Sequence, residues 1–166
     1  MLMTVEKLKE YITTNESESV LEDKLQALEL LIRKYTNNNF QNRNKRFSSA
    51  IIGGNIAEPY PYIMEGDTIQ ISDSEMNNGI YVFSNNMGLI DERCCLITKV
   101  EYPADVIMGA VNMMKWDLEN RDKVGIQSET ISRHSVTYFN MDGDNSIMGY
   151  PKSLLGFLKP YIKARF

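Results

Sequence analysis

The chain has 166 residues, of which 43% are hydrophobic and 24% charged, ordinary values for a globular protein that exclude wholesale disorder. Its formal net charge is −4 at pH 7, which disfavours a protein that grips DNA through its overall charge, since such proteins are usually basic. The longest apolar stretches are too short to cross a bilayer and the N-terminal segment lacks the pattern of a signal peptide, so we expect a soluble intracellular protein with no membrane partner.

The first third of the chain has the pattern of two helices. A first helix is predicted behind Thr4, a good N-cap residue, because apolar residues follow it at helical spacing. A second is predicted to begin at Ser19, which forms a capping-box pattern with Glu22 and precedes a run that stops at the asparagines 37–39. The apolar stripe of this second helix consists of Leu21, Leu25, Leu28, Ile32 and Tyr35.

Turn-forming residues multiply between residues 47 and 100, where short β-like runs alternate with loops. Residues 68–72 alternate apolar and polar side chains with a period of two, which is typical of a half-buried strand. Asn78 and Gly79 precede an apolar run, and because both tolerate positive φ they predict a hairpin turn. We therefore expect a small antiparallel β unit, curled or closed into a barrel.

Helical patterning returns after Tyr102. Pro103 suits a first helical turn, Asp105 favours the positive end of the helix dipole, and Gly125 is placed to end the helix. The elements expected after it are a strand pair at 129–131 and 135–139, a polar loop, and a short helix from Pro151 that Pro160 bends or ends.

These elements predict a single α+β domain over residues 1–166. It is expected to be mostly helical, with about four helices in a body made of residues 1–46 and 101–166. The antiparallel β unit is expected to be a small insertion at about residues 47–100.

The search for catalytic or metal-binding patterns is negative. His134 is the only histidine, and no nucleophile-elbow pattern accompanies it. Cys94 and Cys95 are the only cysteines and lack the further ligands that a zinc site needs. The run from Asp142 resembles a calcium loop but lacks the glycine and glutamate at the required positions. We therefore predict no catalytic residue, no metal and no cofactor.

Two basic clusters could contact a partner. One, after the second helix, consists of Arg43, Lys45 and Arg46; the other, near the end of the chain, consists of Lys159, Tyr161, Lys163, Arg165 and Phe166. Cations mixed with aromatic residues suit a nucleic-acid backbone or an acidic protein surface, and solvated charge at helix ends is the simpler interpretation of both. The second cluster is the better candidate, because a chain end that combines aromatic residues and cations favours a partner.

Several stretches of the chain resemble the head–tail connector (head completion or adaptor) proteins of long-tailed phages, in particular those of Gram-positive hosts. They cover most of the chain and are distinctive by their combination and order. The stretches are 25–35 with Thr36-Asn37-Asn38; Asn77-Asn78-Gly79-Ile80-Tyr81; 128–138; Gly149-Tyr150-Pro151 with Leu154-Leu155; Leu158-Lys159-Pro160-Tyr161; and Arg165-Phe166.

The resemblance implies a structural subunit, not an enzyme, that needs no cofactor. Such subunits assemble with copies of themselves into a ring of about twelve, with heterologous contacts between neighbours. The ring lies beneath the portal protein in the neck of the virion, meets a tail-completion or further connector protein, and lets DNA pass without sequence-specific binding. Assembly takes place in the host cytoplasm. The second basic cluster is then a candidate for portal docking, while the β unit departs from the shortest family members.

Two other functions remain open. A small phage or bacterial nucleic-acid-binding module would use the β unit as its binding surface, although residues 68–83 contain acids and no Lys or Arg. A small hydrolase would use His134 with a carboxylate or cysteine, although no motif supports it.

Overall fold

The computed structural model describes residues 1–121, 128–131, 134–137 and 145–164, with backbone alone for the two middle ranges. The chain divides into two compact units. One, here called the helical unit, comprises Leu2–Asn37 and Pro103–Phe166; the other, the sheet unit, comprises Met1 and Asn38–Tyr102.

The helical unit begins with two capped helices, α1 (Val5–Lys9) and α2 (Glu18–Thr36). Thr4 caps α1 as predicted, since its hydroxyl accepts the Lys7 N–H. The cap of α2 is Ser17, not the predicted Ser19: the Ser17 hydroxyl accepts the Val20 N–H at 3.4 Å. The start of this helix was therefore predicted slightly late.

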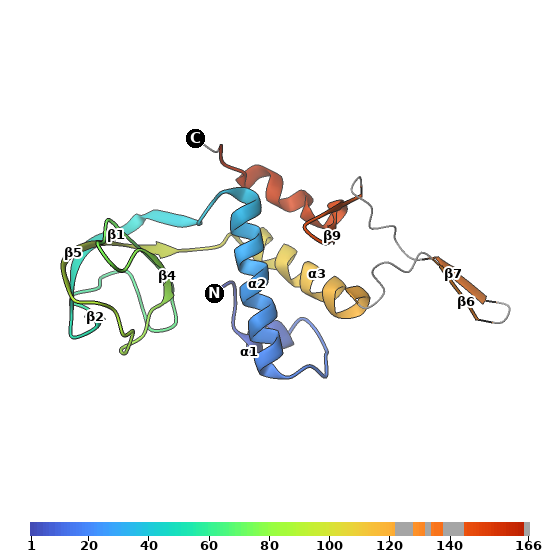
Figure 1. Ribbon diagram of the computed structural model, residues 1–166, viewed down its shortest axis with the longest axis horizontal. Coiled ribbons are helices and arrows are strands. Elements are labelled where there is room, and N and C mark those ends of the chain that lie inside the picture. The colour runs from blue at the N-terminus through green and yellow to red at the C-terminus, as the bar shows by residue number, and fades with distance from the viewer. Residues whose placement is uncertain (122–127, 132–133, 138–144, 165–166) are drawn as a thin grey trace. The chain divides into compact units, whose positions relative to one another are not determined.

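The rest of the helical unit consists of α3 and several shorter elements. They are α3 (Ala104–Asn120), the antiparallel pair β6 (Ser128–Ile131) and β7 (His134–Thr137), the pair β8 (Ser146–Ile147) and β9 (Tyr150–Pro151), and the 3₁₀ helix η2 (Lys152–Tyr161). Both α2 and η2 pack on α3 (Figure 1). Gly109 permits the close approach of η2, because a Cβ there would lie 2.3 Å from the Phe157 ring.

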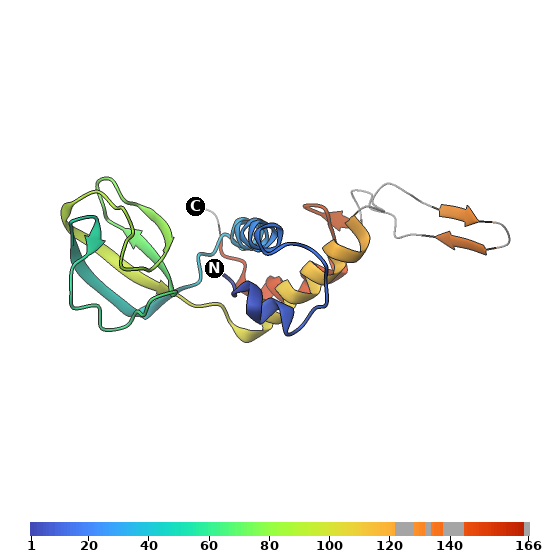
Figure 2. The same cartoon turned by 90° about the horizontal axis from the view of Figure 1, so that it is seen from below.

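The sheet unit is a five-stranded antiparallel sheet with the order β2-β1-β5-β3-β4. Its strands are β1 (Gln41–Ile52), β2 (Asn55–Ile56), β3 (Thr68–Ser72), β4 (Gly79–Val82) and β5 (Glu92–Val100). The sheet curls around a core of its own (Figure 2). That core consists of Ile51, Ile56, Ile63, Ile69, Ile71, Phe83, Cys95 and Ile97.

The predicted fold class is wrong in its proportions. The curled five-stranded sheet is a main body of the protein, not a small insertion in a mostly helical domain. The main cause is β1, which already begins at Gln41. The first half of β1 is polar and cationic and has no apolar alternation. β2 pairs with the last two residues of β1, so the preceding part forms an edge of the sheet. Charged residues are typical of such an edge.

The predicted hairpin is confirmed, since β3 and β4 pair antiparallel, but Asn78 and Gly79 do not form its turn by positive φ. Ile71 on β3 pairs with Gly79, which makes Gly79 the first residue of β4. The connection is the longer loop 73–78, in which Asp73 carries the positive φ of 54°. The side chains of this loop hold it together, as described below.

Candidate functional site

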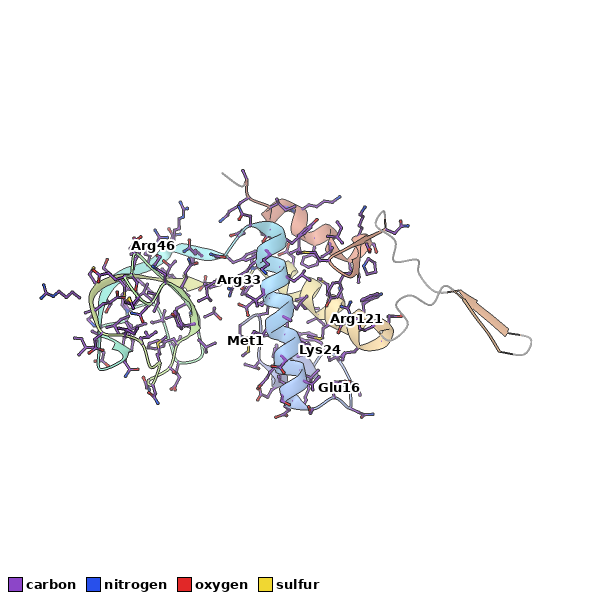
Figure 3. The ribbon with its side chains drawn as sticks, in the orientation of Figure 1. Met1, Glu16, Lys24, Arg33, Arg46 and Arg121 are labelled. Carbon is purple, nitrogen blue, oxygen red and sulfur yellow. The ribbon has the colours of Figure 1, made fainter. Side chains whose placement is uncertain are left out.

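A groove on the helical unit combines an apolar floor with a charged wall. It has a volume of about 220 Å³ and lies between α2, α3 and the β8–β9 turn. Figure 3 labels two of its residues, Lys24 on α2 and Arg121 at the end of α3. The groove is lined by Lys24, Ala27, Leu28, Leu31, Met114, Asp117, Arg121, Met148 and Tyr150.

The charged wall is built around the buried carboxylate of Asp117, which is 6% exposed. This carboxylate accepts hydrogen bonds from Lys24 Nζ and Arg121 Nε, each at 2.6 Å, and from the Tyr150 hydroxyl at 3.3 Å. Burial acts to raise the pKa of Asp117, but the hydrogen bonds from the two cations outweigh it and hold the pKa below its ordinary value. Asp117 is therefore ionised at neutral pH.

Arg121 is fixed from several sides. Besides Asp117, its guanidinium donates to the Gly149 carbonyl at 3.0 Å and lies 4.8 Å from the centre of the Tyr150 ring and 5.4 Å from that of Trp116. Burial, followed by the negative charge of Asp117, raises the pKa of Tyr150, so its hydroxyl stays neutral. Two cations thus face one carboxylate, so the described lining of the groove carries one more positive than negative charge.

This arrangement suits binding better than catalysis. Among the described residues that line it, none is a serine, cysteine or histidine, the side chains that most often act as a nucleophile or as a base near pH 7. Within the described part of the chain, no group of three or more His, Cys, Asp and Glu side chains could hold a metal ion. The groove can accept an apolar side chain that carries, or stands beside, a negative charge.

A second feature lies at one end of the sheet unit, where three loops are tied together; we call it the loop end. It is formed by the β1–β2 turn, the β3–β4 loop and the segment before β5. Asn77 is 3% exposed and makes a reciprocal pair with Ile90: its side-chain oxygen accepts the Ile90 N–H and its amide donates to the Ile90 carbonyl, each at 2.8 Å. Gly54 donates its N–H to Asp91 at 2.8 Å and accepts the Leu89 N–H at 3.0 Å.

Glu92 completes the ties at the loop end. Its carboxylate accepts hydrogen bonds from the Ser74 hydroxyl, the Glu75 N–H and the Asn77 amide at 2.9, 3.0 and 3.2 Å. Desolvation acts to raise the pKa of Glu92, but these donors together lower it below its ordinary value. The loop end is therefore a framework held by hydrogen bonds between loops.

This framework presents large apolar side chains beside acids. Ile52, Met76 and Ile90 are 66%, 65% and 52% exposed. Exposed acids adjoin two of them in sequence, Glu75 beside Met76 and Asp91 beside Ile90. An ordered surface of this composition is typical of a protein-binding site.

The residues predicted for portal docking are partly engaged within the helical unit. Lys159 and Lys163 are exposed, whereas Tyr161 is half-buried and its hydroxyl donates to Asp105 at 2.8 Å, which raises the pKa of Tyr161. The Lys163 N–H donates to the Thr36 carbonyl at 2.8 Å. Arg165 and Phe166 lie outside the described residues. The chain end is therefore held against α2 and α3 as far as residue 164, and its exposed cations are Lys159 and Lys163.

The first basic cluster lies on β1. Lys45 pairs with Glu101, and Arg46, labelled in Figure 3, donates from Nε to the Thr98 hydroxyl at 3.0 Å. Arg43 is exposed. Two of the three cations thus have structural partners.

The remaining candidates for chemistry gain no support. Burial, followed by the charge of Glu92, raises the pKa of the Cys95 thiol to about 11, so this thiol stays protonated and unreactive. Cys94 is exposed. The side chain of His134 and residues 142–144 of the calcium-like loop lie outside the described side chains.

The groove was missed by the sequence analysis. Lys24 and Asp117 are 93 positions apart, so nothing in the sequence connects them. The i,i+4 spacing of Asp117 and Arg121 was a readable signal for an ion pair. No protein-family model and no curated protein matches the chain. Among the described residues, every helix is too short or too polar to cross a membrane.

Proposed function

We propose that this protein is a structural subunit of the head–tail connector of a tailed bacteriophage. In that role it forms a ring of about twelve copies beneath the portal and extends the DNA channel toward the tail. The observation that carries the proposal is the loop end of the sheet unit, where Ile52, Met76 and Ile90 are more than half exposed on an ordered framework.

The apolar loop end favours assembly because its side chains are held in place by the loops beneath them. Exposed apolar groups in an ordered patch gain free energy when a partner removes them from water. Since the framework is already ordered, binding loses little further conformational entropy. A subunit of a ring needs a surface of this kind for contact with its neighbours.

The other features of the molecule support a structural role. Among the described residues that line the groove there is no serine, cysteine or histidine, and its one carboxylate, Asp117, is engaged by both Lys24 and Arg121. The net charge of −4 suits the wall of a channel through which DNA slides without being gripped. The proposal of a connector protein in particular rests on the resemblance described above. The stretches that carry it include residues 25–35 in α2 and 149–161 around η2.

Portal docking is assigned to the exposed cations near the end of the chain. Lys159 and Lys163 flank Ile162, which is 48% exposed. A surface of two lysines around an apolar side chain suits an acidic, partly apolar partner. Arg165 and Phe166 extend the same composition in sequence.

The proposal is tested by incorporation onto portal-bearing heads made by the phage or prophage that encodes the chain. The parent protein is expected to bind these heads and to restore tail attachment in a strain that lacks it. The double variant Lys159→Glu with Lys163→Glu is expected to remain folded and to lose binding, whereas Lys115→Glu, an exposed lysine of α3, keeps it. Tail attachment without the protein would overturn the proposal.

A nucleic-acid-binding module is the second candidate, and the position of Arg43, Lys45 and Arg46 on β1 is the observation that favours it. It predicts DNA binding that weakens steeply with added salt and is reduced by Arg43→Ala. The connector proposal predicts that binding to duplex DNA stays weak and that Arg43→Ala leaves incorporation onto heads unchanged.

A further inference from the structure

The groove of the helical unit has room for one large side chain. An apolar cavity of about 150 Å³ is enough to hold benzene, and the groove volume is about 220 Å³. Its floor is apolar, with Leu28 and Met114 each 2% exposed, and Ala27 at the rim leaves it open to solvent. A methionine or isoleucine side chain of a partner therefore fits in size and polarity.

The wall of the groove favours a negative charge next to that side chain. An ammonium has three donors, and Lys24 uses one of them on Asp117. Its side chain is 32% exposed and that of Arg121 is 39% exposed, so both cations are reachable from solvent. A carboxylate that arrives beside the apolar side chain would neutralise the surplus positive charge.

The loop end of the sheet unit contains two pairs of an exposed apolar residue and a neighbouring exposed acid. Met76 follows Glu75, and Asp91 follows Ile90, and all four side chains are exposed. The reciprocal hydrogen bonds between Asn77 and Ile90 bring the two segments that carry these pairs next to each other. The loop end thus presents apolar side chains and carboxylates that the groove is suited to receive.

We infer that the groove of one subunit receives the loop end of the sheet unit of a second copy of this chain, with Met76, the more exposed of the two apolar side chains, on the apolar floor and Glu75 or Asp91 beside Lys24. The inference rests on the proposed function, because it names the contact between neighbours in the ring. The two surfaces differ, so the contact is heterologous and repeats from copy to copy until a ring closes.

Zero-length crosslinking between copies of different isotopic mass tests this contact. The full chain is prepared with ¹⁴N and with ¹⁵N, mixed, bound to portal-bearing heads and treated with a carbodiimide, which joins a lysine amine to a carboxylate as an amide. Mass spectrometry then identifies crosslinked peptides that contain both isotopes, and these can arise only from two different copies. We expect mixed-isotope links from Lys24 to Glu75 or Asp91.

Matched variants show whether the link depends on the groove and the loop end. Ala27→Trp fills the groove, and Gln26→Trp places the same side chain at an exposed position of α2 outside the lining. Met76→Asp removes the apolar side chain, and Met64→Asp makes the same change at a position that is 73% exposed and precedes β3 instead of following it. The groove and Met76 variants should lower the yield of the mixed link by about tenfold, as loss of a central contact does, while both controls retain it.

The outcomes separate this inference from the proposed function. Multiple copies on the heads without a mixed link from Lys24 to Glu75 or Asp91 would overturn the inference and leave the connector ring in place. A mixed link from Lys24 to Glu65, at the other end of β3, or to a portal carboxylate would also overturn it, because the groove would then have a different occupant. Failure of the parent protein to bind the heads would overturn both.

Discussion

The two units of this protein bury polar groups in different ways. At the loop end of the sheet unit, the buried polar side chains are neutral: Ser74 and Asn77 satisfy neighbouring loops and are satisfied by them. The helical unit instead buries the carboxylate of Asp117 against two cations from different parts of the chain. At the loop end the buried polar groups satisfy one another. Around Asp117 the two cations outnumber the carboxylate, so this site favours a negatively charged partner.

The largest effect is expected from placing a charge in the core of one unit. Leu28→Asp puts a carboxylate at a position that is 2% exposed, at a cost of about 3–5 kcal/mol. Because the sheet unit has its own core, we expect the helical unit to unfold while amide protons of β5 remain protected from exchange. Circular dichroism and hydrogen exchange measure the two. Leu30→Asp, at a position 50% exposed on the same helix, is the control. Full helicity of the Leu28 variant would contradict the placement of α2 in the core.

Removing the buried charge of the helical unit is expected to cost less. Asp117→Asn leaves Lys24 and Arg121 without their carboxylate, and because both cations are partly exposed we expect the free energy of unfolding to fall by about 1–3 kcal/mol at pH 7. Urea unfolding measures the difference, with Glu119→Gln, an exposed acid of the same helix, as the control.

The effect of Asp117 also has a predicted dependence on pH. The pKa of Asp117 in the folded protein lies below its ordinary value of 3.8, so the unfolded chain takes up the proton first as the pH falls. The advantage of the parent protein over Asp117→Asn is therefore complete above pH 3.8 and is lost as the pH falls through the folded-state pKa. An advantage that grew toward low pH would contradict the ion pairs around Asp117.

A smaller effect is expected at the loop end. Asn77→Ala removes the hydrogen bonds to both backbone groups of Ile90 and to Glu92, and we expect a loss of about 1–2 kcal/mol. The exchange of the Ile90 amide proton should become faster, while the exposed Asn86→Ala leaves it unchanged. An unchanged Ile90 amide in the Asn77 variant would show that the loops are ordered by other contacts.

The smallest effect is expected at the chain end. Tyr161→Phe removes the hydroxyl that donates to Asp105 at 2.8 Å, and because this pair is open to solvent we expect a slight fall in melting temperature. Calorimetry compares it with the parent protein. A fall as large as that of Asn77→Ala would mean that the chain end contributes to the core of the helical unit.

The sequence predicted those elements whose signal is local. The stripe on α2 was readable, and its residues Leu21, Leu25, Leu28 and Ile32 are buried as expected. The alternation in β3 was readable for the same reason, because one face of that strand lies on the core of the sheet unit. A regular spacing of apolar residues indicates that one face of a helix or strand is buried, and this holds for both α2 and β3.

The remainder depends on pairing between distant segments. The polar first half of β1 is a strand because β5 supplies its hydrogen-bonding partners, which its own side chains do not reveal. The loop 73–78 replaces a tight Asn-Gly turn because Ser74 bonds to Glu92 at the start of β5 and Asn77 bonds to Ile90 just before it. The groove joins Lys24 to Asp117 across most of the chain. In each case the decisive contact is non-local.

The native mass of the purified chain across a concentration series, alone and with portal rings, tests the connector account most directly. The account predicts a closed species of about a dozen copies, formed at high concentration or on the portal ring, because heterologous contacts repeat until they close. A dimer that persists at every concentration and in the presence of portal rings would contradict it, since a dimer closed on itself leaves no surface for a ring.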